Sequence, residues 1–183
     1  MIARRALLQT GLGLVGGLAL APSLASRALA FAPPVRRLAF NNLHTGEALD
    51  VAYFENGAYV PEALTAVNHV LRDWRNNETH EIEPKLLDLL ALLTASVETR
   101  SRVNVICGYR SPATNAMLHA HSSEVASGSL HLKGQAIDIR IPGVETAHLR
   151  DAAQRLAIGG VGYYPESDFV HVDIGRVRRW QGT

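Results

Sequence analysis

The sequence of 183 residues has little cysteine and no excess of charge of one sign. Its single cysteine, Cys107, excludes an internal disulfide framework and a zinc cluster built from thiolates. A bound metal would therefore have to use histidine, aspartate or glutamate, and the chain contains eight histidines. The 18 basic and 17 acidic residues give a formal charge of +1, too balanced for a surface that neutralises many phosphates. We therefore expect no nucleic acid partner.

The chain also lacks an apolar run of the roughly 20 residues that a transmembrane helix requires. The run Thr10–Pro22 is shorter, contains several glycines and follows the arginine pair Arg4 and Arg5. Small residues then surround Ala30, which completes the layout of a cleaved leader, and the arginine pair favours the twin-arginine route. We predict that residues 1–30 are a signal peptide cut after Ala30. The twin-arginine export machinery would then deliver the protein to the periplasm, with no stable membrane anchor.

Apolar patterns in residues 31–183 predict one α+β domain. The runs Val35–Leu43 and Ala48–Phe54 predict a β-hairpin, and helical spacing follows Pro61 and continues from Pro84 to about Val97. Further strands are expected at Val103–Cys107, Ala136–Ile141, Val161–Tyr164 and Phe169–Ile174, and further helices at Pro112–Leu118 and Glu145–Leu156. We expect three or four of these strands to form a central antiparallel sheet, with helices packed on one face.

Residues capable of chemistry gather in three short segments: Gly108–Asn115, Ser129–Asp138 and Phe169–Asp173. The second segment meets every fixed position of the pattern Ser-x-His-x-x-Gly-x-Ala-x-Asp. In this it resembles the zinc D-Ala-D-Ala metallopeptidases, a superfamily shared with lysostaphin-type enzymes and the hedgehog fold. With the other segments included, the chain is most similar to the murein endopeptidase K branch of exported bacterial enzymes, over roughly residues 36–180.

The resemblance implies a zinc site with one ion per chain, held by His131, Asp138 and His171. The residues suit this role, because a hydrolytic zinc site takes three protein ligands and leaves one position open for water. Strand alternation places Asp138 opposite Ile137 and Ile139, away from the apolar side. Two neighbouring strands could then direct Asp138 and His171 at one ion.

Hydrolysis also needs a proton acceptor and a cation for the developing oxyanion. We favour Asp173 as the base, because it shares a strand face with His171; its alternative role is to support that histidine. Asp168 is at the position where the wider superfamily often has a glutamate, and Glu166 is a third candidate. Arg110 matches the superfamily arginine that polarises the scissile carbonyl or binds a substrate carboxylate.

Other polar residues offer weaker signals. His80-Glu81 begins a zincin-like string that fails at Pro84, and His119 and His121 lie at an expected helix end facing solvent. Ser129 is expected to steady the loop of His131 rather than act as a nucleophile.

The leading functional hypothesis is a zinc peptidase that cuts the peptide cross-links of peptidoglycan, with the peptide stems as substrate. Two alternatives remain: a D,D-carboxypeptidase, and a zinc-containing but inactive peptidoglycan-binding module.

Overall fold

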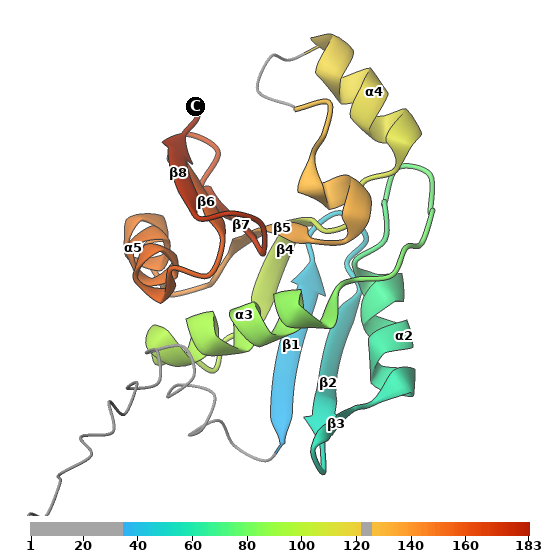
Figure 1. Cartoon of the computed structure of the whole chain (residues 1–183), viewed down its shortest axis with the longest axis vertical. Helices are drawn as coiled ribbons and strands as arrows, with labels where there is room; N and C mark the ends of the chain where they lie inside the picture. Colours follow the sequence, from blue (N-terminus) through green and yellow to red (C-terminus); the bar gives the residue numbers. More distant parts are fainter. Residues whose placement is uncertain (1–34, 122–125) are drawn as a thin grey trace, which may run out of the picture.

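The computed structural model describes residues 35–121 and 126–183 (Figure 1). The predicted leader and its cleavage site lie outside these ranges. The described strands are β1 (Arg36–Asn42), β2 (Ala48–Glu55), β3 (Ala58–Tyr59), β4 (Val103–Cys107), β5 (Ala136–Arg140), β6 (Gly160–Tyr164), β7 (Phe169–Asp173) and β8 (Arg178–Gln181). The described helices are α2 (Pro61–Val70), α3 (Pro84–Ser96), α4 (Pro112–His121), α5 (Thr146–Leu156) and the short 3-10 helix η1 (Leu130–Lys133). None of these helices is long and apolar enough to cross a bilayer.

All eight described strands join one sheet in the order β3-β2-β1-β4-β5-β7-β6-β8. The predicted β1–β2 hairpin is confirmed, and so is the antiparallel β6–β7 pair. The expected antiparallel pairing holds for the four neighbouring strands β4, β5, β7 and β6. The sheet as a whole is mixed, because β1 pairs with β4 and β6 pairs with β8 in parallel. The chain between β1 and β4 includes two helices and is long enough for a parallel return. Since β7 lies between β5 and β6, strand β8 can pair only at the outer edge of β6.

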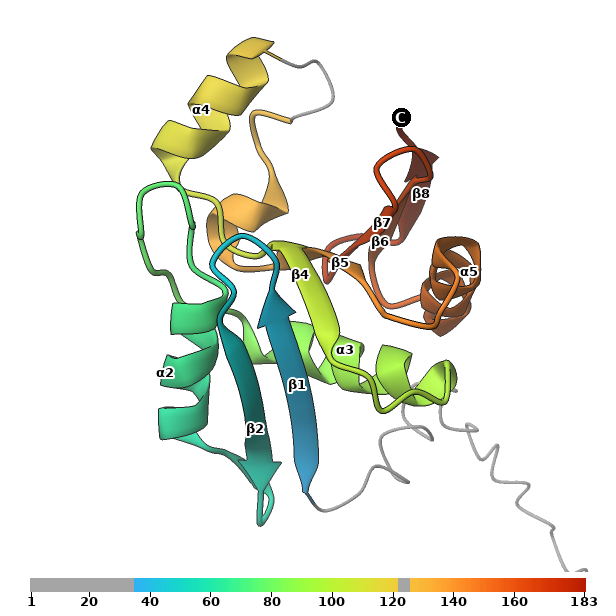
Figure 2. The same ribbon diagram turned by 180° about the vertical axis from the view of Figure 1, so that it is seen from behind.

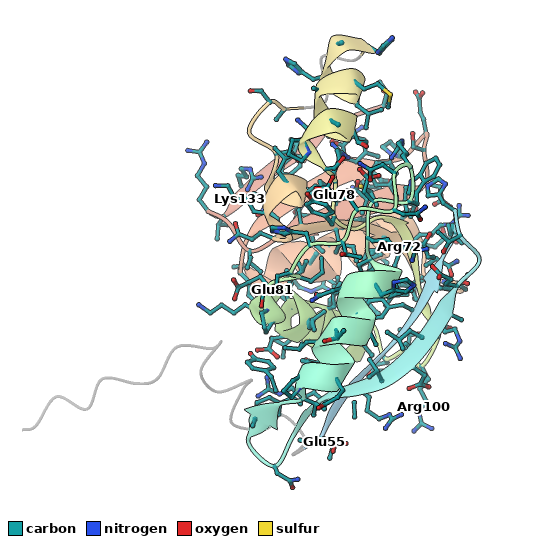
Figure 3. The ribbon with its side chains drawn as sticks, turned by 90° about the vertical axis from the view of Figure 1, so that its right-hand side faces the viewer. Glu55, Arg72, Glu78, Glu81, Arg100 and Lys133 are labelled. Carbon is teal, nitrogen blue, oxygen red and sulfur yellow. The ribbon has the colours of Figure 1, made fainter. Side chains whose placement is uncertain are left out.

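One apolar core joins the sheet to the helices. Helix α3 crosses the sheet in Figure 1, and the strands lie in front of it in the opposite view of Figure 2. In the side view of Figure 3, α2 lies against the β1–β2 pair. Buried side chains from the two central strands β5 and β7 enter this core: Ile137, Ile139, Val170 and Val172. Alternation along the strands therefore directs Asp138, His171 and Asp173 to the other face of the sheet.

Candidate metal centre and active site

An open cavity of about 430 Å³ lies on this second face. Polar groups from separate segments meet in its wall, namely Arg110, His131, Asp138 and His171. Aromatic side chains form another part of the wall, together with Arg178 from β8. Four segments that are distant in the sequence thus contribute to one site.

The position of His131 is set by the short helix η1. The Ser129 hydroxyl accepts the backbone N–H of His131 at 3.4 Å, and Gly134 ends the helix with a φ of +62°. A side chain at Gly134 would collide with the carbonyl of Glu81, so glycine is required there. Lys133 extends into solvent from the same helix (Figure 3), whereas His131 is only 3% exposed. The ring Nδ1–H of His131 donates to the Gly108 carbonyl at 2.7 Å, which leaves Nε2 to face the cavity.

Asp138 and His171 are cross-strand partners on β5 and β7. Nδ1 of His171 lies 2.8 Å from Oδ1 of Asp138, and Nε2 of His131 lies 3.3 Å from the same oxygen. The two histidine nitrogens are 3.2 Å apart. Zinc bonds of about 2.0–2.2 Å in tetrahedral geometry separate ligand atoms by roughly 3.3–3.5 Å. The triangle therefore has nearly the size that a zinc ion needs, and the three residues expected from the sequence are brought together.

The charges of the triad also suit a cation. Burial alone would raise the pKa of Asp138, but His131 and His171 hold it well below its usual range, so the carboxylate is ionised. Burial alone would lower the pKa of His131, yet Asp138 and Cys107 hold it well above its ordinary value. The centre thus stabilises positive charge, and a divalent ion would compete with the proton for it.

Cys107 also lies beside the triad, a position that the sequence patterns did not predict. It is the last residue of β4 and pairs in register with Asp138. Ligand atoms of Cys107, His131 and Asp138 all lie within 4.8 Å of one another. The expectation that only His, Asp or Glu could serve a metal here therefore overlooked a buried thiol. The available signal was its place on a buried strand directly before the Gly108–Asn115 segment.

Asp173 lies beside His171, as its place on the strand predicted, but at the nitrogen that faces away from the triad. Its Oδ2 accepts the Nε2–H of His171 at 3.0 Å, and the Arg178 guanidinium donates to both oxygens, at 2.7 and 3.1 Å. The backbone N–H groups of Gly160 and Gly175 also donate to Oδ1. Burial would raise the pKa of Asp173, but these partners hold it well below its usual range. The carboxylate is fully buried and already accepts five hydrogen bonds.

The other two acids expected near the site do not enter the cavity wall. Asp168 accepts hydrogen bonds from Thr146 at 2.8 Å and Arg140 at 3.3 Å, and these three residues line a separate hollow. Glu166 is exposed in the turn between β6 and β7. The structure therefore does not bring either side chain to the triad.

Arg110 is held beside the triad by weak contacts. Its backbone N–H donates to the His131 carbonyl at 3.2 Å, and its side chain is only 11% exposed. The guanidinium lies 4.0 Å from Oδ2 of Asp138, 3.4 Å from Asn115 and 3.6 Å from the sulfur of Cys107. Its Nε is buried without a hydrogen-bond partner among the described residues. Because Arg110 lines the cavity and the contacts of its terminal guanidinium nitrogens are long, these nitrogens can donate to an anionic oxygen bound there.

The comparison with known families agrees with this geometry. A family model described as "Peptidoglycan L,D-endopeptidase MepK" matches residues 30–180. The chain belongs to this family. The resemblance to the zinc D-Ala-D-Ala peptidases, in the murein endopeptidase K branch, is thereby confirmed, and the chain is a member of a peptidase family.

Curated members of the MepK family match almost the whole chain. The peptidoglycan L,D-endopeptidase MepK of Escherichia coli (strain K12) is 45% identical over 177 residues, covering 97% of this chain and 96% of that protein. The probable MepK of Haemophilus influenzae is 40% identical over 173 residues, covering 92% and 93%. The solved structure of Serratia marcescens L-Ala D-Glu endopeptidase ChiX gives a TM-score of 0.33 at 23% identity, over 42% of this chain and 62% of that one. That score is too low to indicate a shared overall fold.

The aromatic part of the cavity wall in this MepK family member was not anticipated from the sequence. The rings of Tyr164 and Phe169 stack at 4.4 Å, and the indole N–H of Trp180 donates to the Tyr164 hydroxyl at 3.0 Å. The Trp180 ring also lies 5.1 Å from the ring of His171. A substrate bound at the triad would therefore contact an aromatic surface.

The described cavity wall does not include His80, His119 or His121, the histidines that gave only weak signals in the sequence. His80 stacks on Tyr109 at 4.7 Å and precedes helix α3, so it begins no helical zincin motif. His121 is exposed at the end of α4, and its Nδ1 lies 2.7 Å from the carbonyl of Met117.

Proposed function

We propose that the protein is a zinc-dependent peptidoglycan endopeptidase. The observation that carries this proposal is the triangle of His131 Nε2, Asp138 Oδ1 and His171 Nδ1, with sides of 2.8–3.3 Å, beside Arg110 in an open cavity. The names of the relatives indicate an L,D bond within the peptide cross-links as the substrate bond. The predicted leader supports a periplasmic location, where peptidoglycan is accessible.

His131, Asp138 and His171 would hold the ion, one per chain. Two neutral imidazoles and a carboxylate are a common donor set for hydrolytic zinc. When bound, zinc supplies Lewis acidity and lowers the pKa of a coordinated water. Cys107 lies close to the ion in this proposal but is not one of its ligands, because His131, Asp138 and His171 already supply the three protein ligands of a hydrolytic zinc site.

The remaining residues orient the donors and the substrate. The Gly108 carbonyl fixes the tautomer of His131, and Asp173 fixes that of His171, so both free nitrogens face the same point. Arg110 would donate to the oxyanion that develops when the amide carbonyl is attacked. Trp180 and Tyr164 would contact the peptide stem.

We further propose that Asp173 supports His171 rather than accepting a proton from water. Its oxygens are already satisfied, its pKa is held far below neutrality, and it contacts the imidazole instead of the open cavity. Asp168 is bound in the separate hollow with Thr146 and Arg140. Of the described residues that line the cavity, Asp138 alone has a carboxylate side chain.

Digestion of purified sacculi tests the proposed activity. The protein should release new muropeptides, identified by mass; a chelator should abolish the release, and added zinc should restore it. Purified muropeptide dimers joined by an L,D bond should be cut, whereas dimers joined by a D,D bond should not. Release of terminal D-Ala alone would indicate a D,D-carboxypeptidase. An unchanged muropeptide profile at every zinc concentration would contradict enzymatic activity and support the inactive binding module.

A further inference from the structure

Strand β8 brings an arginine to the back of the metal centre. It pairs with β6 at the edge of the sheet, which aligns Arg178 with Gly160. Arg178 and Trp180 line the cavity, whereas Arg179 between them is exposed and its guanidinium donates to the Gln154 carbonyl at 3.4 Å. The two neighbouring arginines of one strand thus have different surroundings.

The contact of the Arg178 guanidinium with the Asp173 carboxylate is bidentate. NH2 donates to Oδ2 at 2.7 Å and NH1 donates to Oδ1 at 3.1 Å, the fork geometry in which arginine binds carboxylates most specifically. Gly160 makes this arrangement possible, since any side chain there would collide with both the guanidinium and the carboxylate. Its backbone N–H instead donates to Oδ1 at 2.9 Å.

The fixed orientation of the Asp173 carboxylate in turn limits the orientation of the His171 ring. The oxygen that receives the shorter Arg178 bond, Oδ2, is also the oxygen that accepts Nε2–H of the imidazole at 3.0 Å. With both carboxylate oxygens fixed by Arg178, the plane of the carboxylate is fixed, and so is the direction in which it holds the ring. Nδ1 of His171 then faces Asp138 and His131.

We propose that Arg178 is a positioning residue for the metal centre, which acts through Asp173 to set the orientation of the ligand His171. This inference rests on the proposed zinc-dependent function. It assigns a role to a strand that contributes none of the three ligands. Partners that orient ligating histidines typically affect metal affinity by about 10–100-fold.

Zinc affinity, measured by competition with a chromophoric chelator, tests the proposal without any assay of hydrolysis. Arg178→Gln should weaken zinc binding by about 10–100-fold. Arg178→Lys should recover part of this loss, because an ammonium can reach one oxygen but cannot form the fork. Arg179→Gln, which removes the same charge from the next residue of the strand, should bind zinc as the unmodified chain does.

Thermal unfolding in the presence of a chelator separates positioning from a structural role. A purely structural role would lower the unfolding temperature of Arg178→Gln while its folded fraction kept full zinc affinity, and that result would overturn the proposal. If Arg178→Gln does not fold, undiminished affinity in Arg178→Lys would overturn it instead. Failure of the unmodified chain to bind zinc would contradict the proposed function itself, which distinguishes the two failures.

Discussion

At the scale of single residues, the convergence of His131, Asp138 and His171 could be predicted, whereas the surroundings of the acids could not. The spacing of His131 and Asp138 within one ten-residue pattern is a local signal, and strand alternation placed Asp173 on the face of His171. Which hydrogen bonds occupy Asp173 depends on Gly160 and Arg178, which reach it only through the pairing of β6, β7 and β8. No pattern local to Asp173 contains that information.

Asp173→Asn distinguishes support of a ligand from proton transfer. The amide offers one acceptor where the carboxylate offers two, so it cannot serve both Arg178 and His171 as before. We expect zinc affinity to fall by about 10–100-fold, measured by chelator competition. Full zinc affinity together with turnover reduced by roughly 10²-fold would instead make Asp173 the base. Asp168→Asn is the matched control and should change neither quantity.

The identity of the third ligand is tested by comparing substitutions of His171 and Cys107, with His131→Ala as the reference for the loss of one ligand. His131→Ala should remove most of the zinc, because one of three ligands is lost. Cys107→Ser should retain about one zinc per chain, measured by elemental analysis after gel filtration. Like His131→Ala, His171→Ala should lose most of the zinc. Loss of zinc from Cys107→Ser but not from His171→Ala would show that Cys107, His131 and Asp138 form the true site.

Arg110→Lys tests the oxyanion role. Lysine keeps the positive charge but lacks the planar fork, so it holds an anionic oxygen less specifically. The zinc content should equal that of the unmodified chain, while kcat on a purified cross-linked dimer should drop by roughly 10²-fold, the scale of losing one oxyanion donor. An unchanged kcat with a raised KM would assign Arg110 to binding of a substrate carboxylate in the ground state.

At the scale of helices and strands, the predictions succeeded where apolar residues alternate or recur at helical spacing. Strands β5 and β7 were predicted because isoleucine and valine occupy every second position. Strand β8 was missed because its sequence, Arg178-Arg179-Trp180-Gln181, lacks that alternation. The parallel pairs β1–β4 and β6–β8 were missed for another reason: a sequence pattern indicates strands but not which edge remains free for pairing.

At the scale of the whole molecule, the prediction concerns export. Residues 1–30 are expected to direct the protein through the twin-arginine route, which reads the guanidinium pair Arg4 and Arg5. Replacing both with lysine keeps the charge and should leave the precursor in the cytoplasm, detected by fractionation and immunoblotting. Substituting Arg27 alone with lysine serves as the control and should not change delivery. Periplasmic delivery of the double variant would indicate the general secretion route.

The edge position of β8 has a consequence for behaviour on heating. An edge strand with a single neighbour opens at lower free energy than the central strands β5 and β7, which are paired on both sides. Opening of β8 would free Arg178 from Asp173 while Asp138 and His171 stayed on the paired strands β5 and β7 and His131 stayed on η1. Zinc should therefore bind more weakly at temperatures where the core is still folded, so that the dissociation constant rises before the cooperative unfolding transition begins.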